Sequence, residues 1–146
     1  MDEIRPWLYI GKFRDTLSKS YLEAKSIQAM LQLAEKVEQP GITSLFLPVQ
    51  DLEPIPLNLL KQGIDFIRGE KQKGHRVLVA CGAGINRSSA FCTAALKEAE
   101  GLSLMVAFKE VKMNHPESMP HQPVWESLCK YYGKSITYLD IMRIGL

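Results

Sequence analysis

Cysteine is scarce in this sequence, and its scarcity excludes two classes of small protein. The 146 residues include three cysteines, Cys81, Cys92 and Cys129, and no two of them form a CxxC pair. A disulfide framework needs an even set of paired cysteines, and a zinc finger needs paired ligands at short spacing. We therefore expect free thiols and a reducing, cytoplasmic setting, where structural disulfides are rare.

Long apolar runs and a strong excess of one charge are also missing. No run approaches the roughly 20 apolar residues that a helix needs to cross a bilayer. Lys and Arg number 18 against 16 Asp and Glu, so the net charge is only +2. Binding to nucleic acid or to an anionic membrane usually requires a concentrated basic face. We therefore expect neither kind of partner, and the acidic start Met1-Asp2-Glu3 does not resemble a signal peptide.

The remaining composition is that of an ordinary globular domain. Hydrophobic residues make up 46% and charged residues 23% of the chain, close to the averages for such domains. A chain of this length has room for about one hydrophobic core. We expect residues 1–146 to form a single, monomeric domain. Within it, residues 134–146 form a C-terminal extension whose pattern fits one short helix or one strand.

Apolar patterning predicts strands and helices in alternation. Runs of strand length lie at residues 7–10, 42–47 and 77–80. The last two are continuously apolar, as in buried parallel strands. Helical spacing occurs at residues 21–37, 57–72, 87–100, 103–113 and from about 123 to 132. Pro54 and Pro56 indicate a loop over residues 50–56. This order predicts an α/β fold with a central, mainly parallel sheet flanked by helices.

The segment 77–88 (VLVACGAGINRS) carries the candidate chemistry. A buried strand ends at Cys81, and Arg87 follows where a helix begins. The N–H groups of a tight loop and the positive end of a helix together make an anion site. Gly82 and Gly84 permit the backbone conformations that such a loop needs, and the guanidinium fork of Arg87 can bind two oxygens. The same field favours a thiolate, so Cys81 is a candidate nucleophile.

This segment matches the signature loop C-x5-R-[ST] of the cysteine-dependent protein tyrosine phosphatases, and the chain resembles their small dual-specificity branch. Four further segments agree with that branch in the same order, namely residues 4–11 (IRPWLYIG), 41–43 (GIT), 47–51 (LPVQD) and 111–128. The resemblance spans roughly residues 4 to 132. It implies a three-layer protein tyrosine phosphatase fold in a compact version.

The resemblance also implies a mechanism, the hydrolysis of a phosphomonoester in two steps without metal or cofactor. Cys81 would attack phosphorus and form a phosphocysteine, while Arg87 and the loop amides hold the phosphate oxygens. His121, or the neighbouring amide Gln122, would border the pocket. The substrate-binding residues would be Gly82, Ala83, Gly84, Ile85, Asn86 and Arg87.

Two more residues have roles by this resemblance. Asp51 would protonate the leaving oxygen and then activate the water that hydrolyses the intermediate. Glu53, two residues later, is a rival acid. Ser88 would hydrogen-bond the Cys81 sulfur and help it leave in the second step, and helix capping is the alternative role for Ser88.

The chain departs from the family pattern at three places. Ala80 stands where the family usually has a histidine that braces the loop and tunes the thiol. Asn86 replaces a small residue, and a related branch that acts on RNA 5′ ends also carries Asn there. The stretch between Gly41 and Asp51 is short, so the strand after Gly41 is expected to run straight into the acid loop.

The expected partner is a phosphorylated protein or a small phosphate ester. Phosphotyrosine is the leading substrate, with phosphoserine and phosphothreonine as further candidates. One alternative is a non-protein substrate: a phosphoinositide, a nucleotide or an RNA 5′ end. Another is a non-catalytic phosphate-binding module, which would be expected to lack Cys81, Arg87 or the acid. Cys92 and Cys129 are expected to be buried structural residues, and a disulfide between Cys92 and Cys81 stays open.

Overall fold

One five-stranded sheet organises the computed structural model, which describes residues 1–144. The strands are β1 (Asp2–Arg5), β2 (Leu8–Lys12), β3 (Ile27–Gln32), β4 (Thr43–Phe46) and β5 (Arg76–Cys81). Their order across the sheet is β1-β2-β5-β3-β4. β1 is antiparallel to β2, and the other three neighbouring pairs are parallel. The predicted mainly parallel sheet is confirmed.

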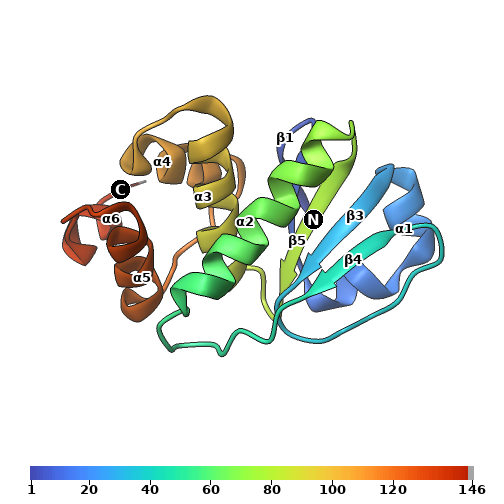
Figure 1. The fold of residues 1–146 in the computed structure, drawn as a ribbon, viewed down its shortest axis with the longest axis horizontal. Coiled ribbons are helices and arrows are strands. Elements are labelled where there is room, and N and C mark those ends of the chain that lie inside the picture. Colours follow the sequence, from blue (N-terminus) through green and yellow to red (C-terminus); the bar gives the residue numbers. More distant parts are fainter. Residues whose placement is uncertain (145–146) are drawn as a thin grey trace.

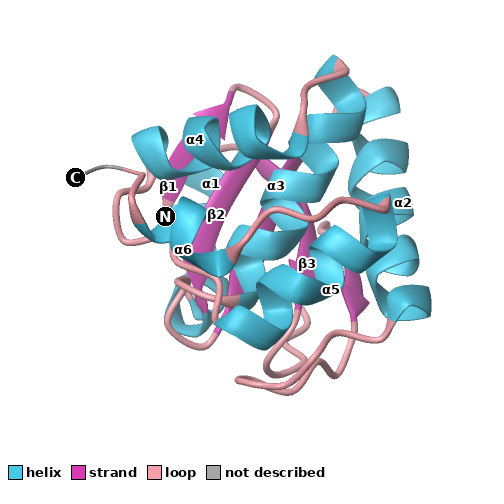
Figure 2. Ribbon diagram, turned by 90° about the vertical axis from the view of Figure 1, so that its left-hand side faces the viewer, coloured by secondary structure: helices cyan, strands magenta, loops and turns pink. Residues whose placement is uncertain are grey.

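Helices cover both faces of this sheet. They are the short 3-10 helix η1 (Phe13–Leu17), α1 (Lys19–Ala24), α2 (Leu57–Gln72), α3 (Arg87–Glu100), α4 (Leu104–Asn114), α5 (Gln122–Tyr132) and α6 (Tyr138–Met142). Figure 1 shows α2 to α6 on one side of the sheet and α1 on the other. In Figure 2, which turns the molecule by 90°, the larger group of helices lies over the strands. The predicted three-layer arrangement is confirmed.

The central strand β5 separates two apolar cores. Successive side chains of a strand point to opposite faces of the sheet. Val77, Val79 and Cys81 belong to the large core under α2 to α5, whereas Leu78 and Ala80 belong to the small core beside α1. The alternation therefore places Cys81 on the helix-rich side of the sheet, at the carboxyl end of the strand. Ala80 faces an apolar layer on the other side.

The helix predicted over residues 21–37 is wrong. α1 ends at Ala24, and Ser26 adopts a φ of 57° that interrupts the helical backbone. The apolar residues that follow form β3, which pairs in parallel with both β5 and β4. β3 is buried on both faces, so its apolar residues show no strand alternation and also fit a helical period. Backbone pairing with two neighbouring strands decides the outcome, because buried N–H and C=O groups require partners.

The strand predicted at residues 42–47 is present as β4, but the prediction that it is buried is wrong. β4 lies at the edge of the sheet, and its residues are exposed or half-buried. It runs straight into the loop over residues 47–56, as the short stretch after Gly41 predicts.

The later helices follow the predicted segments. α2 and α3 match the segments at 57–72 and 87–100, and α4 and α5 begin and end within a residue of theirs. In the C-terminal extension, residues 138–142 form α6, which packs on α5, while residues 145–146 lie outside the described residues. Within residues 1–144, no helix combines the length and the apolar character of a membrane span.

Candidate active site

The signature loop connects the carboxyl end of β5 to the N-terminus of α3. Cys81 is the last residue of β5, and α3 begins at Arg87. Cys81 is only 2% exposed, and its sulfur accepts a hydrogen bond of 3.5 Å from the N–H of Ser88 in the first turn of α3. The N-terminus of the helix therefore faces the sulfur, an arrangement that stabilises negative charge there.

Arg87 is anchored by hydrogen bonds on one side, and its Nε on the other side makes none. Its Nη1 donates to the carbonyl oxygens of Leu33 (3.3 Å) and Val49 (2.8 Å), which hold the guanidinium plane in place. Its Nε is buried and has no hydrogen-bond partner among the described residues. A guanidinium has five N–H donors, so the edge that includes Nε remains available for the oxygens of an anion.

A pocket of about 100 Å³ opens at this edge of Arg87. It is lined by Asp51, Cys81, Ala83, Ile85, Asn86, Arg87 and His121. The structure therefore brings together the predicted nucleophile, the predicted acid and most of the predicted loop ligands. A larger hollow of about 550 Å³ beside α4 is lined by Lys109, Lys112, Met113, Pro116, Arg143 and Ile144. The chemistry of the lining residues, and not the size of the hollow, makes the small pocket the candidate site.

Asp51 reaches the pocket from the loop between β4 and α2. Its Oδ1 accepts a hydrogen bond of 2.7 Å from Nδ2 of Asn86 and lies 3.7 Å from Nε of Arg87. The carboxyl side chain is 53% exposed, so it can meet both a substrate and water. Glu53, the rival acid, is exposed and does not line this pocket.

Gly84 lets the signature loop approach β2 directly. Its φ is 72°, and a Cβ atom at this position would lie 2.8 Å from the carbonyl oxygen of Gly11. A side chain here would be strained and would also collide with backbone, so the position requires glycine. The predicted glycine-dependent turn is confirmed at Gly84.

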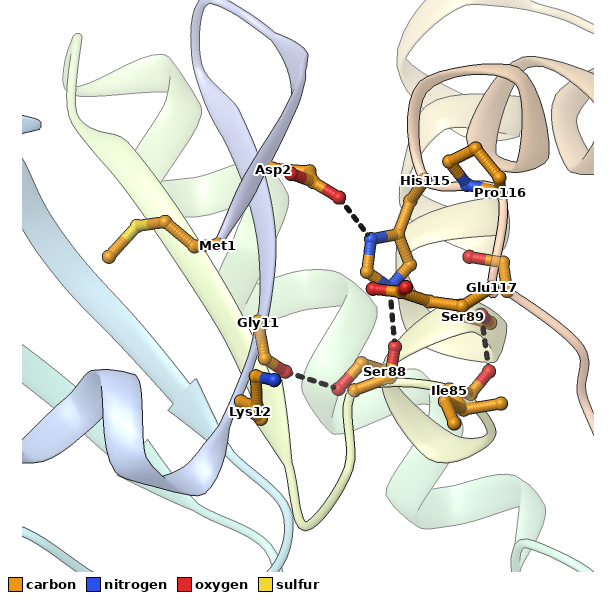
Figure 3. A network of polar contacts seen from close by, with 12 residues as sticks. Met1, Asp2, Gly11, Lys12, Ile85, Ser88, Ser89, His115, Pro116 and Glu117 are labelled. Atoms are coloured by element: carbon orange, nitrogen blue, oxygen red, sulfur yellow. Dashed lines mark hydrogen bonds and ion pairs between the residues drawn. The ribbon is translucent and has the colours of Figure 1, made fainter.

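Ser88 contacts the sulfur of the candidate nucleophile Cys81 through its backbone. The backbone N–H of Ser88, and not its hydroxyl, donates to the Cys81 sulfur. The hydroxyl donates to the carbonyl oxygen of Gly11 at 3.5 Å, as Figure 3 shows. The predicted hydrogen bond from Ser88 to the Cys81 sulfur is therefore present, and the backbone N–H makes it. Its effect on the second step stays a prediction.

The side chain of Asn86 has a connecting role that the sequence did not indicate. Its Oδ1 accepts a hydrogen bond of 2.7 Å from the N–H of His121, and its Nδ2 donates to Asp51. It thereby joins the acid loop to the start of α5. Of the two predicted bordering residues, His121 lines the pocket, whereas the amide of Gln122 donates to Glu126. A spacing pattern cannot reveal such a link between three distant segments.

The other two cysteines are buried, as predicted. Cys81, Cys92 and Cys129 are all free thiols. Burial raises the pKa of Cys92 well above its ordinary value, and the nearby Cys81 raises it further. Burial also raises the pKa of Cys129. Neither thiol is therefore suited to act as a nucleophile.

Comparison with known proteins agrees with this geometry. The family model described as "Dual specificity phosphatase, catalytic domain" matches residues 8–134. The chain belongs to this family. Human dual specificity protein phosphatase 5 is 30% identical over 133 residues, which cover 88% of this chain and 35% of that protein. The chain thus spans about a third of the length of the curated relatives it matches first.

Solved structures of relatives share the fold of this dual-specificity phosphatase family member. The crystal structure of human DUSP28 has a TM-score of 0.81 and 28% identity, covering 91% of this chain and 96% of that one. Human tyrosine phosphatase-like serine/threonine/tyrosine-interacting protein also has a TM-score of 0.81, with 26% identity and coverage of 91% and 95%. Phosphatases and a phosphatase-like protein therefore share this fold, and the site residues must carry the functional argument.

Proposed function

We propose that the chain is a phosphatase catalytic domain that hydrolyses phosphotyrosine, phosphoserine and phosphothreonine esters through a phosphocysteine. One observation carries the proposal. A single pocket of about 100 Å³ is lined by Cys81, Asp51 and Arg87, and the buried Nε of Arg87 makes no hydrogen bond there and lies 3.7 Å from the Asp51 carboxylate. This arrangement is suited to bind an oxyanion, because the fixed guanidinium edge and the helix N-terminus both stabilise negative charge.

The first step transfers the phosphoryl group to sulfur. A lone pair of the Cys81 thiolate forms the S–P bond while the ester P–O bond breaks, and the leaving oxygen takes the proton of the Asp51 carboxyl. The equatorial oxygens are held by Arg87 and by the loop N–H groups of residues 82 to 87, which neutralise the charge that develops on them.

The second step releases phosphate. A water molecule gives a proton to the Asp51 carboxylate as its oxygen attacks phosphorus, and the S–P bond breaks. Inorganic phosphate leaves, Cys81 returns to the thiolate and Asp51 is again protonated, so every proton is accounted for. The Ser88 N–H stabilises the departing sulfur by its hydrogen bond of 3.5 Å.

The size of the pocket supports more than one phosphorylated residue as substrate. A volume of about 100 Å³ encloses little more than a phosphate group, whereas pockets that bury a whole small molecule measure about 300 Å³ or more. The rest of the substrate therefore lies outside the pocket. The relatives, named as dual specificity protein phosphatases, favour a protein substrate over the phosphoinositide, nucleotide and RNA alternatives.

The wider setting is part of the same proposal. Three free thiols support a reducing, cytoplasmic environment, and the weak net charge of +2 favours a protein over a nucleic-acid partner. We infer that residues 1–146 act as one catalytic domain and as a monomer.

Hydrolysis of p-nitrophenyl phosphate by three variants tests the proposal. We expect Cys81→Ser to lose turnover by about a thousandfold or more, because no other residue of the pocket can replace the thiolate. We expect Asp51→Ala to lose about tenfold or more, while Glu53→Ala stays near the wild type. Normal turnover by Cys81→Ser would overturn the mechanism. If Glu53→Ala lost turnover while Asp51→Ala retained it, Glu53 and not Asp51 would be the general acid.

A further inference from the structure

His115, in the segment between α4 and α5, is buried behind the signature loop. The residue is only 3% exposed. Its Nδ1 lies 2.6 Å from the Oδ2 of Asp2 on β1, and Figure 3 shows this contact. Its Nε2 lies 2.7 Å from the carbonyl oxygen of Gly84 in the signature loop. One imidazole ring therefore connects the N-terminal strand to the phosphate-binding loop.

The hydrogen-bond partners of the His115 ring determine which of its nitrogens carry a proton. A carbonyl oxygen and an ionised carboxylate only accept hydrogen bonds, so each facing nitrogen must donate. A neutral imidazole has one N–H, whereas the imidazolium has two. Only the imidazolium form of His115 satisfies both the Asp2 and the Gly84 contacts. The Oε1 of Glu117, 3.3 Å from Nε2, adds a second carboxylate beside the cation.

The charged groups around the ring come from several elements. Asp2 and Glu117 touch it directly, and their carboxylates are about half exposed. The hollow of about 190 Å³ next to the ring is also lined by Met1, Lys12 and Asp15, and Asp15 pairs with the amino group of Met1 at 3.3 Å. The groups in direct contact with His115 are thus acceptors and acids, which favour a cation at this place.

The hydrogen bond to Gly84 sets the direction of one loop amide. In a planar trans peptide the C=O and the following N–H point in opposite directions. Because the Gly84 carbonyl points at His115, the N–H of Ile85 points away from His115. Ile85 lines the catalytic pocket, and His115 does not. The Ile85 N–H is therefore directed to the side on which the phosphate binds.

Neighbouring contacts show that the whole segment supports the loop. The N–H of Met119 donates to the Ile85 carbonyl oxygen at 3.0 Å, and the N–H of His121 donates to Asn86 at 2.7 Å. With the His115 contact, three successive loop residues are held by the segment 115–121. Of these three contacts, that of His115 uses a titratable side chain. β5 offers no comparable support, because Ala80 is apolar and faces the small core.

We propose that His115, held as an imidazolium by Asp2, is a positioning residue of the signature loop. It orients the Gly84–Ile85 peptide so that the Ile85 N–H meets the phosphate, and it places one positive charge behind the loop. The inference rests on the proposed phosphatase function for its kinetic consequence, but the protonation of the ring can be tested without any activity.

Nitrogen NMR of the histidine rings tests the protonation directly. In the full chain at neutral pH, we expect both nitrogens of His115 to carry a proton, because both face hydrogen-bond acceptors. Asp2→Asn removes the carboxylate, and we expect the His115 ring to become neutral at a lower pH in this variant. A neutral His115 ring in the wild type, or a ring that is insensitive to Asp2→Asn, overturns the proposal.

Kinetics tests the positioning role. We expect His115→Gln to lower kcat/KM for p-nitrophenyl phosphate by about tenfold and to weaken inhibition by inorganic phosphate, because a neutral amide cannot supply the charge. We expect Asp2→Asn to act in the same direction, with its loss growing as the pH rises. His75→Gln is the matched control, since His75 contacts Glu70 and lies outside the pocket.

Two outcomes separate this inference from the proposed function. If His115→Gln and Asp2→Asn keep the wild-type kcat/KM and pH profile while Cys81→Ser is inactive, His115 has no positioning role and the phosphatase function stands. If the wild type has no turnover, the proposed function fails, and the NMR result still decides the state of the ring. Circular dichroism and thermal unfolding of each variant show whether it is folded.

Discussion

At the scale of the residue, the amide of Asn86 can have only one orientation. The N–H of His121 must meet an acceptor, so Oδ1 faces His121 and Nδ2 faces Asp51. Since Asn86 donates to Oδ1 of Asp51, the proton of the acid belongs on Oδ2, the oxygen left for the leaving group. Asn86 therefore orients Asp51, the proposed general acid, in addition to supplying its backbone to the signature loop.

Replacing Asn86 should affect proton donation selectively. We expect Asn86→Ala to lower kcat/KM by about tenfold for aryl phosphates with basic leaving groups. For strongly activated aryl phosphates, which need little proton donation, we expect a much smaller loss. The measurement is a series of aryl phosphates of graded leaving-group basicity, with Asp51→Ala as the reference for full loss of the acid. A uniform loss over the series would instead indicate a role in phosphate binding.

The three thiols should differ in their reactivity. We expect iodoacetate to label Cys81, and inorganic phosphate to protect it, because the anionic reagent binds where the phosphate binds. Burial raises the pKa of Cys92 and of Cys129, which keeps both as unreactive thiols. Mass spectrometry of peptides after timed labelling checks this. Labelling of Cys92 as fast as Cys81 would contradict it, and Cys81→Ser is the control for background reaction.

At the scale of the element, α2 and α3 pack closely enough for one glycine to determine the fit. A Cβ atom on Gly63 would overlap the buried ring of Phe91 in α3. Gly69, six residues later on the same helix, has open space where its Cβ would lie. Both positions have a helical backbone, so a comparison of alanine substitutions at the two separates the effect of helix propensity from the effect of packing.

Alanine at these two positions should act in opposite directions. We expect Gly63→Ala to destabilise the fold by about 1–3 kcal/mol, because Phe91 has no room to move in the core. We expect Gly69→Ala to stabilise it by roughly 0.5–1 kcal/mol, the gain in helix propensity. Urea unfolding of both variants gives the free energies. A neutral or stabilising effect of Gly63→Ala would show that the α2–α3 contact is loose.

At the scale of the whole molecule, Arg5 joins the edge of the sheet to two helices. Its guanidinium donates to both oxygens of Glu100 at the end of α3 (2.7 and 3.1 Å) and to Glu110 on α4 (3.3 Å). The hydrogen bond from Arg5 lowers the pKa of Glu100 below its ordinary value of 4.5. β1, which also carries Asp2, is thereby held against α3 and α4.

This contact should make part of the stability depend on pH. A carboxyl whose pKa is lowered in the folded state contributes stability above its ordinary pKa and loses it as the pH falls through the folded value. We expect Arg5→Met to lower the free energy of unfolding by about 1 kcal/mol near neutral pH, a small value because the Arg5–Glu100 pair is partly exposed. The cost should disappear at a pH below the folded pKa of Glu100.

Urea unfolding of the wild type and of Arg5→Met over a range of pH measures this difference. The matched control is Lys19→Met, which removes the exposed Lys19–Glu23 pair and should change stability by less than about 0.5 kcal/mol. A cost of Arg5→Met that stays constant into the acid range would show that the contact acts through packing and not through charge.

Features that depend on neighbouring residues could be predicted from the sequence. The candidate nucleophile Cys81, the glycine turn and Arg87 lie within seven consecutive residues between a strand and a helix, so their chemistry can be recognised locally. The bounds of α2 and α3 follow in the same way from apolar spacing and from Gly74 and Gly101, because helical hydrogen bonds are short-range.

Features that depend on distant segments could be read only from the folded structure. β3 is a strand because β5 and β4 pair with it, although its apolar run also fits a helix. Ser88 turns its hydroxyl to Gly11, and His115 reaches Gly84 across 31 positions. Burial on both faces, and the need of each buried polar group for a partner, select these contacts. Burial and the pairing of distant polar groups arise only when the chain folds, so a local sequence pattern cannot predict these contacts.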